Sequence, residues 1–210
     1  MIHIANDNSE PLSRKERETA WRKRAILQAA GEIFEADGYI SATMAQIASK
    51  AEFGVGTIYR FFPSKQMLFA EVILQGIELF RSGLRESIAD KASWQEELKS
   101  FVEYHLTWIE KNPAFHRLVY EIFYSPIPDL TNRIFEVFKD THKGIKTFHG
   151  SIFFHANKTG ERFDPDLMTL MILGMMHVIG DNCYLGMLSK PPTEYIPGVL
   201  KVVLGEEISG

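Results

Sequence analysis

Apolar residues recur at spacings of three and four along most of this chain, which is the pattern of amphipathic helices. The segment after Pro63 is typical, with Phe69, Ile73, Ile77 and Phe80 on one face of a long helix. We find no segment with the strict alternation of a half-buried strand, and no internal repeat or low-complexity stretch. The pattern therefore predicts an all-α protein of about nine helices.

Capping and breaking residues place the ends of these helices. Ser13 with Glu16 and Thr43 with Gln46 form capping boxes, in which each side chain bonds the backbone N–H of the other residue. Ser64, Ser93, Asn112, Asp164 and Thr193 are further candidate caps. The expected helices span about 13–36, 43–51, 54–62, 64–88, 93–111, 112–125, 129–155, 164–189 and 193–204.

Two of these helices, between Thr43 and Phe62, are too short to be stable alone and must pack against a scaffold. Such a pair usually serves to place its second helix in a DNA major groove, with the first residues of that helix at the base edges. Lys65 opens the following helix, where backbone N–H groups favour an anion such as phosphate. The candidate DNA-binding residues are Thr43, Gly54, Val55, Gly56, Thr57, Tyr59, Arg60 and Lys65.

Residues 14–68 resemble the TetR family of bacterial transcription regulators. The resemblance rests on Gly38-Tyr39, Thr43, Ile47-Ala48, Ala51, Gly56-Thr57, Tyr59, Phe62, Ser64-Lys65 and Leu68. It implies a homodimer that binds a pseudo-palindromic double-stranded operator, and a repressor that a small-molecule effector releases. An activator, or a regulator that responds to no ligand, remains an alternative. The family commonly has Gly where this chain has Glu52, and a hydroxyl residue where it has Gly54.

The expected organisation is a flexible tail of residues 1–12, a helix-turn-helix DNA-binding domain of residues 13–66, and a ligand-binding and dimerisation bundle of residues 67–210. Charge follows this division. Residues 1–66 hold nine Lys/Arg and eight Asp/Glu, whereas residues 67–210 hold fourteen and nineteen. Six basic residues at the start of the first helix form either a solvated face or a phosphate-facing one, and both interpretations stay open: Arg14, Lys15, Arg17, Arg22, Lys23 and Arg24.

The cysteine content and the amino-terminal segment favour a cytoplasmic protein. Cys183 is the only cysteine, which excludes an internal disulfide and a cysteine-based zinc site. The first twelve residues lack the basic and apolar regions of a signal peptide. No apolar run reaches the roughly 18 residues that a membrane span needs, so we expect no membrane partner. His142, His149 and His155 lack the spacing of a helical metal site, and we expect no metal and no cofactor.

Aromatic and methionine side chains are abundant after residue 67, and most residues of this kind belong to a core. Related regulators hold a ligand cavity among the fourth to eighth helices, so the resemblance implies an effector site here. Aromatic and thioether side chains suit an apolar or aromatic effector. The candidate ligand-binding residues are Phe80, Phe101, Tyr104, His105, Trp108, Tyr120, Phe123, Phe138, Phe148, Met175 and His177.

The helix expected at 164–189 is apolar on almost every side, from Leu167 to Ile179. Such a helix in a small bundle needs a second partner. Gly174, Gly180 and Gly186 would allow another backbone to approach it. Related regulators dimerise through this helix and the last one, so we expect the homodimer interface there. An all-α enzyme is the rival class, but Ser151, Ser189 and Cys183 lie in no motif that links them to a base, and we expect no catalytic residue.

Overall fold

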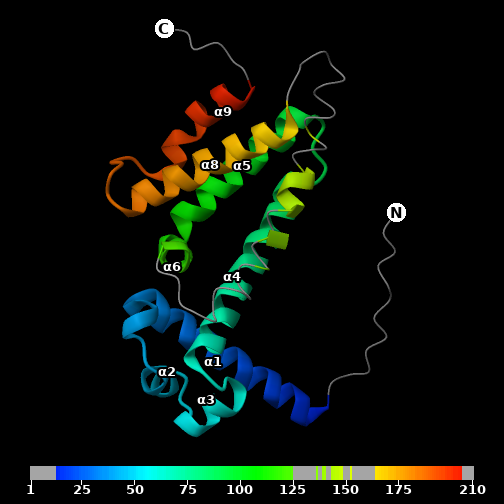
Figure 1. Cartoon of the computed structure of the whole chain (residues 1–210). Helices are drawn as coiled ribbons and strands as arrows, with labels where there is room; N and C mark the ends of the chain where they lie inside the picture. The colour runs from blue at the N-terminus through cyan, green and yellow to red at the C-terminus, as the bar shows by residue number, and fades with distance from the viewer. Residues whose placement is uncertain are drawn as a thin grey trace. The chain divides into compact units, whose positions relative to one another are not determined.

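The computed structural model describes residues 13–124, 136, 139–140, 143–148, 152 and 164–204. Its helices confirm the all-α class and follow one another as shown in Figure 1. The tail expected at 1–12 and most of the helix expected at 129–155 lie outside the described residues, although 143–148 is helical. The elements are α1 (Arg14–Ser41), α2 (Met44–Lys50), α3 (Val55–Phe61), α4 (Lys65–Ile88), α5 (Trp94–Lys111), α6 (Pro113–Tyr124), α8 (Pro165–Tyr184), the 3₁₀ helix η1 (Pro192–Tyr195) and α9 (Ile196–Leu204).

The chain divides into two compact units, and the division falls inside α4, between Val72 and Ile73. The first unit contains α1, α2, α3 and the start of α4. The second contains the rest of α4 and every later helix. Helix α4 therefore begins in the first unit and continues into the second.

In the first unit, α1 buries one apolar face against α2, α3 and the start of α4. Phe34 and Phe69 meet edge to face with ring centroids 4.9 Å apart, and Ile26, Ile47 and Ile58 are fully buried around them. We expected α1 to end near residue 36, but it continues to Ser41 across a break at Gly38. Gly38 has a φ of 75°, a conformation that glycine adopts without steric cost, so the predicted break exists while the helix resumes beyond it.

In the second unit, α5 contacts α6, α8, η1 and α9 around one apolar core. Two glycines of α4 let aromatic side chains approach its backbone. A Cβ on Gly76 would overlap the Phe115 ring, and a Cβ on Gly83 would overlap the Tyr104 hydroxyl. The core residues are Leu84, Trp94, Leu98, Phe101, Val102, Leu106, Ile109, Ile152, Ile172, Leu173, Met176, Val199 and Val203.

Several helix ends differ from expectation because side chains found partners in other elements. Asn112 directly precedes α6 as predicted, and its carbonyl accepts from the His116 N–H at 3.0 Å, but its side-chain amide serves the end of α5 by donating to the Trp108 carbonyl at 2.9 Å. Thr193 does not cap the last helix, because its hydroxyl donates to Glu110 of α5 at 2.5 Å and the residue lies within η1. Helix α8 ends at Tyr184 instead of Ser189, and Gly186 follows it with a φ of 70°.

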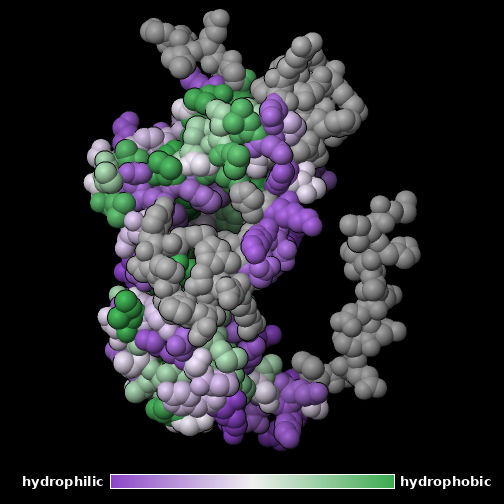
Figure 2. All heavy atoms as spheres, in the orientation of Figure 1, coloured by the Kyte–Doolittle hydropathy of each residue, from purple (hydrophilic) through white to green (hydrophobic). Residues whose placement is uncertain are grey.

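Helix α8 combines a buried face with an exposed apolar one. Ile172, Leu173 and Met176 are buried in the protomer. Among the described residues, α8 has the length and the apolar composition that a membrane-crossing helix needs. From the sequence we expect no segment to meet this test. Figure 2 shows apolar atoms gathered over the region of α8 and α9. The exposed large hydrophobic residues of these helices are Leu167, Leu170, Met171, Val178, Tyr184 and Val202.

Candidate nucleic-acid interface

Helix α2 begins at the predicted capping box. The Thr43 hydroxyl oxygen accepts from the Gln46 backbone N–H at 3.2 Å, and the Gln46 side chain accepts from the Thr43 backbone N–H at 2.9 Å. The Thr43 hydroxyl proton also points to Gln46, with the two oxygens 2.6 Å apart. Thr43 is exposed at the surface, so its hydroxyl oxygen remains accessible while its proton is used within α2.

Helix α3 presents two different faces. Ile58 is fully buried and Phe62, which follows the helix, is 3% exposed, so both are core residues. The opposite face carries Val55, 40% exposed, and Tyr59, 48% exposed, together with the exposed Arg60. A Cβ on Gly56 would meet no protein atom within 4 Å. The first turn of α3 is therefore open to a large partner along its backbone.

The turn between α2 and α3 carries both departures noted in the sequence. Glu52 adopts a φ of 57°, the left-handed conformation expected of a glycine at this position. Gly54 is the N-cap of α3 and supplies no side-chain hydrogen bond to it. An L-residue in the left-handed region costs about 1–2 kcal/mol, so the turn stores strain beside the recognition helix.

We expect Glu52→Gly to raise the free energy of unfolding by about 1 kcal/mol, because glycine relieves the strain but adds freedom to the unfolded chain. Removing a negative charge beside the recognition helix should also strengthen DNA binding. Asp90 is the matched control, with a φ of 56° in the second unit. Thermal unfolding should show that both Glu52→Gly and Asp90→Gly stabilise the fold. Gel shifts should show a higher DNA affinity for Glu52→Gly alone. Equal DNA affinities would show that the charge of Glu52 does not reach the DNA.

Three consecutive residues of α1 contact the aromatic residues at both ends of α3, which the sequence analysis missed. Trp21 meets Phe53 edge to face, with centroids 6.0 Å apart, and the Arg22 guanidinium lies 5.9 Å from the same ring. The Lys23 ammonium lies 5.8 Å from the ring of Phe62. These distances suit cation–π attraction. The pairs link positions more than thirty residues apart, so no local pattern indicates them.

Lys65 has partners other than the phosphate that we expected. Its ammonium donates to the carbonyl oxygens of Tyr39, Ile40 and Ala42 at 2.8, 3.2 and 2.9 Å. It also lies 4.5 Å from the centre of the Tyr39 ring. Burial lowers the pKa of Lys65, whereas the three carbonyl dipoles favour its charged form. An ammonium has three donors, so a phosphate contact would compete with bonds that join the end of α1 to the start of α4.

The basic residues at the start of α1 lie mostly in solvent. Arg14, Lys15 and Arg24 are exposed, while Arg22 also forms an ion pair with Glu18 at 2.6 Å. Figure 2 shows hydrophilic atoms gathered at this end of α1. The same segment carries the aromatic and cationic contacts to the two ends of α3.

Most candidate ligand-binding residues meet in one aromatic cluster within the second unit. Phe80 lies 5.1 Å from His105 and 5.7 Å from Trp108, measured between ring centroids. Phe101 and His105 are buried, and the other members are partly buried except His177, which is exposed. The cluster consists of Phe80, Phe101, Tyr104, His105, Trp108, Phe148 and His177.

The remaining ligand candidates lie elsewhere. Tyr120 pairs with Tyr184, centroid to centroid 5.3 Å, rather than with this cluster. Met175 packs against the apolar core of the second unit. Phe138 and the side chain of Phe123 lie outside what the structure describes. Among the candidates, only Tyr104 and Trp108 line the groove along α5.

Sequence comparison relates the chain to bacterial regulators. The family model of bacterial regulatory proteins of the tetR family matches residues 26–72. The HTH-type transcriptional regulator UidR of Escherichia coli is 32% identical over 150 residues, which are 70% of this chain and 71% of UidR. The HTH-type transcriptional activator FasR of Mycolicibacterium smegmatis is 28% identical over 113 residues, 54% of this chain and about half, 52%, of FasR.

Solved structures share the fold at lower identity. The transcriptional regulator FadR from Bacillus subtilis, in complex with stearoyl-CoA, superposes with a TM-score of 0.74 at 20% identity, covering 88% of this chain and 98% of FadR. AibR, in complex with isovaleryl coenzyme A and operator DNA, superposes with a TM-score of 0.64 at 19% identity, covering 86% and 97%. Both likenesses extend well beyond α1, α2 and α3, so they include the helices of the second unit.

Proposed function

Because this chain belongs to the TetR family of bacterial regulatory proteins and is a DNA-binding transcription regulator, we propose that a homodimer of it reads a pseudo-palindromic operator, one half-site per subunit. The observation that carries the proposal is the exposed face of α3, opposite the buried Ile58 and Phe62. We place this activity in the cytoplasm, and the regulators to which the chain is related give no support to an enzyme.

Each exposed residue of α3 has a chemical role in this proposal. Val55 and the methyl group of Thr57 face thymine methyl groups, and the Thr57 hydroxyl bonds a base or a phosphate. Tyr59 donates its hydroxyl to a phosphate, and Arg60 reaches a base edge or a phosphate. Gly54 and Gly56 let the backbone approach the DNA closely. Thr43 adds a hydroxyl oxygen at the start of α2.

The Gly56→Ala variant tests this arrangement. A methyl group at Gly56 meets no protein atom within 4 Å, so the variant should fold with at least the native stability. The same methyl group would stand between α3 and the DNA. We expect operator affinity to fall by about tenfold or more, which corresponds to about 1.4 kcal/mol. Gel shifts measure the affinity and thermal unfolding measures the stability.

Gly144→Ala is the matched control, because Gly144 also lies in a helical segment with open space around its Cα. This control should bind the operator normally. The DNA itself would come from selection of fragments by the purified protein. Binding should weaken steeply with salt because phosphate contacts release counterions. A Gly56→Ala protein with native affinity for the selected DNA would show that α3 does not approach it as proposed.

The exposed apolar face of α8 and α9 supports a homodimer through these helices. Leu167, Leu170 and Val178 project from α8, and Val202 projects from α9. Gly174 leaves open space beside this face, where a second backbone can approach. A Cβ on Gly180, in contrast, would meet His116 and Ile109 of its own chain, so this glycine serves the packing within the protomer. A stable interface should bury more than about 1,000 Å² in total.

We propose that a small molecule with an apolar part binds the second unit and releases the operator, so that the protein acts as a repressor. FadR and AibR, which share the fold, were crystallised with acyl-coenzyme A molecules, and this supports an effector of that class. Release follows if the effector favours a conformation with lower operator affinity. FasR is an activator, which makes activation the second candidate. A reporter gene behind the selected operator, with and without the protein, decides between them.

A further inference from the structure

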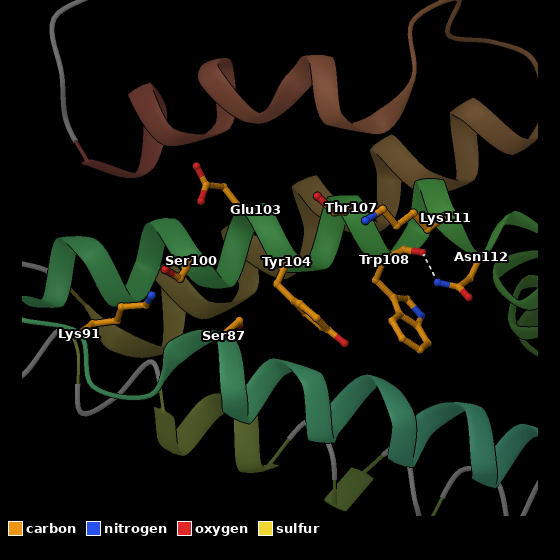
Figure 3. A pocket seen from close by; sticks show the side chains of 9 residues that line it. All are labelled: Ser87, Lys91, Ser100, Glu103, Tyr104, Thr107, Trp108, Lys111 and Asn112. Atoms are coloured by element: carbon orange, nitrogen blue, oxygen red, sulfur yellow. Dashed lines mark hydrogen bonds between the residues drawn. The ribbon is translucent and has the colours of Figure 1, made fainter.

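A groove of about 670 Å³ runs along α5 beside the end of α4, within the second unit. Figure 3 shows Lys91 at one end of the lining row, Lys111 and Asn112 at the other, and the Tyr104 and Trp108 rings between α5 and α4. From Ser100 to Lys111 the groove follows three turns of α5, a rise of about 16 Å. Its volume is that of a small-molecule site.

The groove is rich in hydrogen-bond donors that the protein itself does not use. Among the described residues, the ammonium groups of Lys91 and Lys111 have no acidic partner within ion-pair distance. Ser100 and Thr107 add hydroxyl groups to the same wall. The lining acid is Glu103, and its carboxylate lies 3.8 Å from Lys99. The two ammonium groups therefore stay available to an anion, although Glu110 acts on Lys111 and Glu86 acts on Tyr104 through longer-range electrostatics.

Two aromatic rings form the wall between these charges, and other residues hold them in place. The Tyr104 and Trp108 rings lie 6.1 Å apart with an interplanar angle of 31°, and Phe80 packs against both. The Tyr104 hydroxyl reaches the backbone of α4 at Gly83, where a Cβ would leave no room for it. Burial raises the pKa of Tyr104, with Glu86 acting in the same direction, so its hydroxyl stays protonated near neutral pH.

We propose that this groove binds a planar ring that carries phosphate groups, as in a nucleotide. The ring lies against Trp108 and Tyr104, and phosphate groups on either side of the nucleoside accept from Lys111 at one end of the groove and from Lys91 at the other. Both kinds of contact are favourable at a partly desolvated surface, because aromatic faces stack on planar rings and ammonium groups bind phosphate as point charges. The inference rests on the proposed ligand control, since it assigns the polar part of the effector to named residues of this chain. A free nucleotide and the nucleotide end of an acyl-coenzyme A share this chemistry.

The test is calorimetric titration of the full-length protein with coenzyme A, with ADP and with inorganic phosphate. The Lys91→Ala/Lys111→Ala variant should bind coenzyme A at least about tenfold more weakly. The control variant is Lys143→Ala/Lys146→Ala, which removes two charges from an exposed helical segment outside the groove and should bind normally. Tryptophan fluorescence should change on binding in the native protein, and Trp108→Phe should lose that change.

The possible outcomes distinguish a wrong assignment of the groove from a failure of the proposed ligand control. Binding of ADP and coenzyme A with equal affinity supports the groove as a nucleotide site, whereas tighter binding of coenzyme A supports it as the headgroup site of a larger effector. If the two lysine substitutions leave coenzyme A binding unchanged, the groove is not the nucleotide site, even if an acyl-coenzyme A still releases the operator in gel shifts. If neither coenzyme A nor ADP binds, the proposal that the groove binds a nucleotide is also wrong. Binding in the groove without operator release would instead refute the proposed ligand control.

Discussion

Replacing Leu170 by aspartate should convert the proposed homodimer into monomers and remove operator binding at concentrations where the native protein saturates the DNA. Leu170 is 62% exposed on α8 of the protomer, so a carboxylate there stays hydrated in the monomer. In the proposed dimer it would be buried without a partner, at a cost of about 3–5 kcal/mol. A two-fold interface contains the change twice, so the dissociation constant should rise by at least about a hundredfold.

Light scattering after size-exclusion chromatography measures the oligomeric state, and gel shifts measure DNA binding. Leu79→Asp is the matched control, because Leu79 is 64% exposed on α4 and lies outside the proposed interface. That variant should remain a dimer with native operator affinity. If Leu170→Asp also stayed dimeric with native affinity, the interface could not lie on this face of α8. Circular dichroism of both variants checks that neither has unfolded.

Replacing Lys65 by methionine should destabilise the first unit rather than simply remove one phosphate contact. The change keeps the length of the side chain but removes the donors that three carbonyl oxygens at the end of α1 now share. Hydrogen bonds to charged groups contribute about 1.5–3 kcal/mol each, and water can replace part of this loss at a half-exposed site. We therefore expect the free energy of unfolding to fall by about 2–3 kcal/mol.

Two measurements distinguish this role from phosphate binding. Thermal unfolding should show the loss of stability, while the salt dependence of operator binding keeps its native slope. A phosphate contact would instead reduce that slope by about one unit and leave stability unchanged. Lys50→Met is the control, because it removes a single exposed ion pair with Glu32, at 2.7 Å, and should cost less than about 1 kcal/mol.

The helix-turn-helix could be predicted from sequence because its determinants are local. Thr43 and Gln46 cap one another three residues apart, and Ile58 and Phe62 lie four residues apart on one buried face. The strained Glu52 was also predictable, since the turn there requires a left-handed residue whatever the side chain. The helix ends that differ from expectation, at Thr193 and Ser189, depend on acceptors or turns that a capping pattern does not reveal.

The sequence identifies candidate functional side chains more readily than it identifies the groups that those side chains contact in the fold. Lys65 was recognised as a functional position from its place at the start of α4, yet its acceptors lie 23 to 26 residues earlier in the chain. Trp21 and Phe53 carry no mutual signal in the sequence, although they meet beside the recognition helix. The groove along α5 likewise combines Lys91, which follows α4, with residues spread over three turns of the next helix.

The sequence by itself determined the all-α class, the order of the helices and the exposed face of α3, because capping and hydrophobic spacing act over one or two turns of chain. Only the tertiary structure decided how the charged and aromatic groups are used. It directed Lys65 to the end of α1, gathered Phe80, Phe101 and His105 into one cluster, and left Lys91 and Lys111 beside the rings of α5. Polar and aromatic side chains interact over only a few ångströms, so their roles depend on which helices packing brings together.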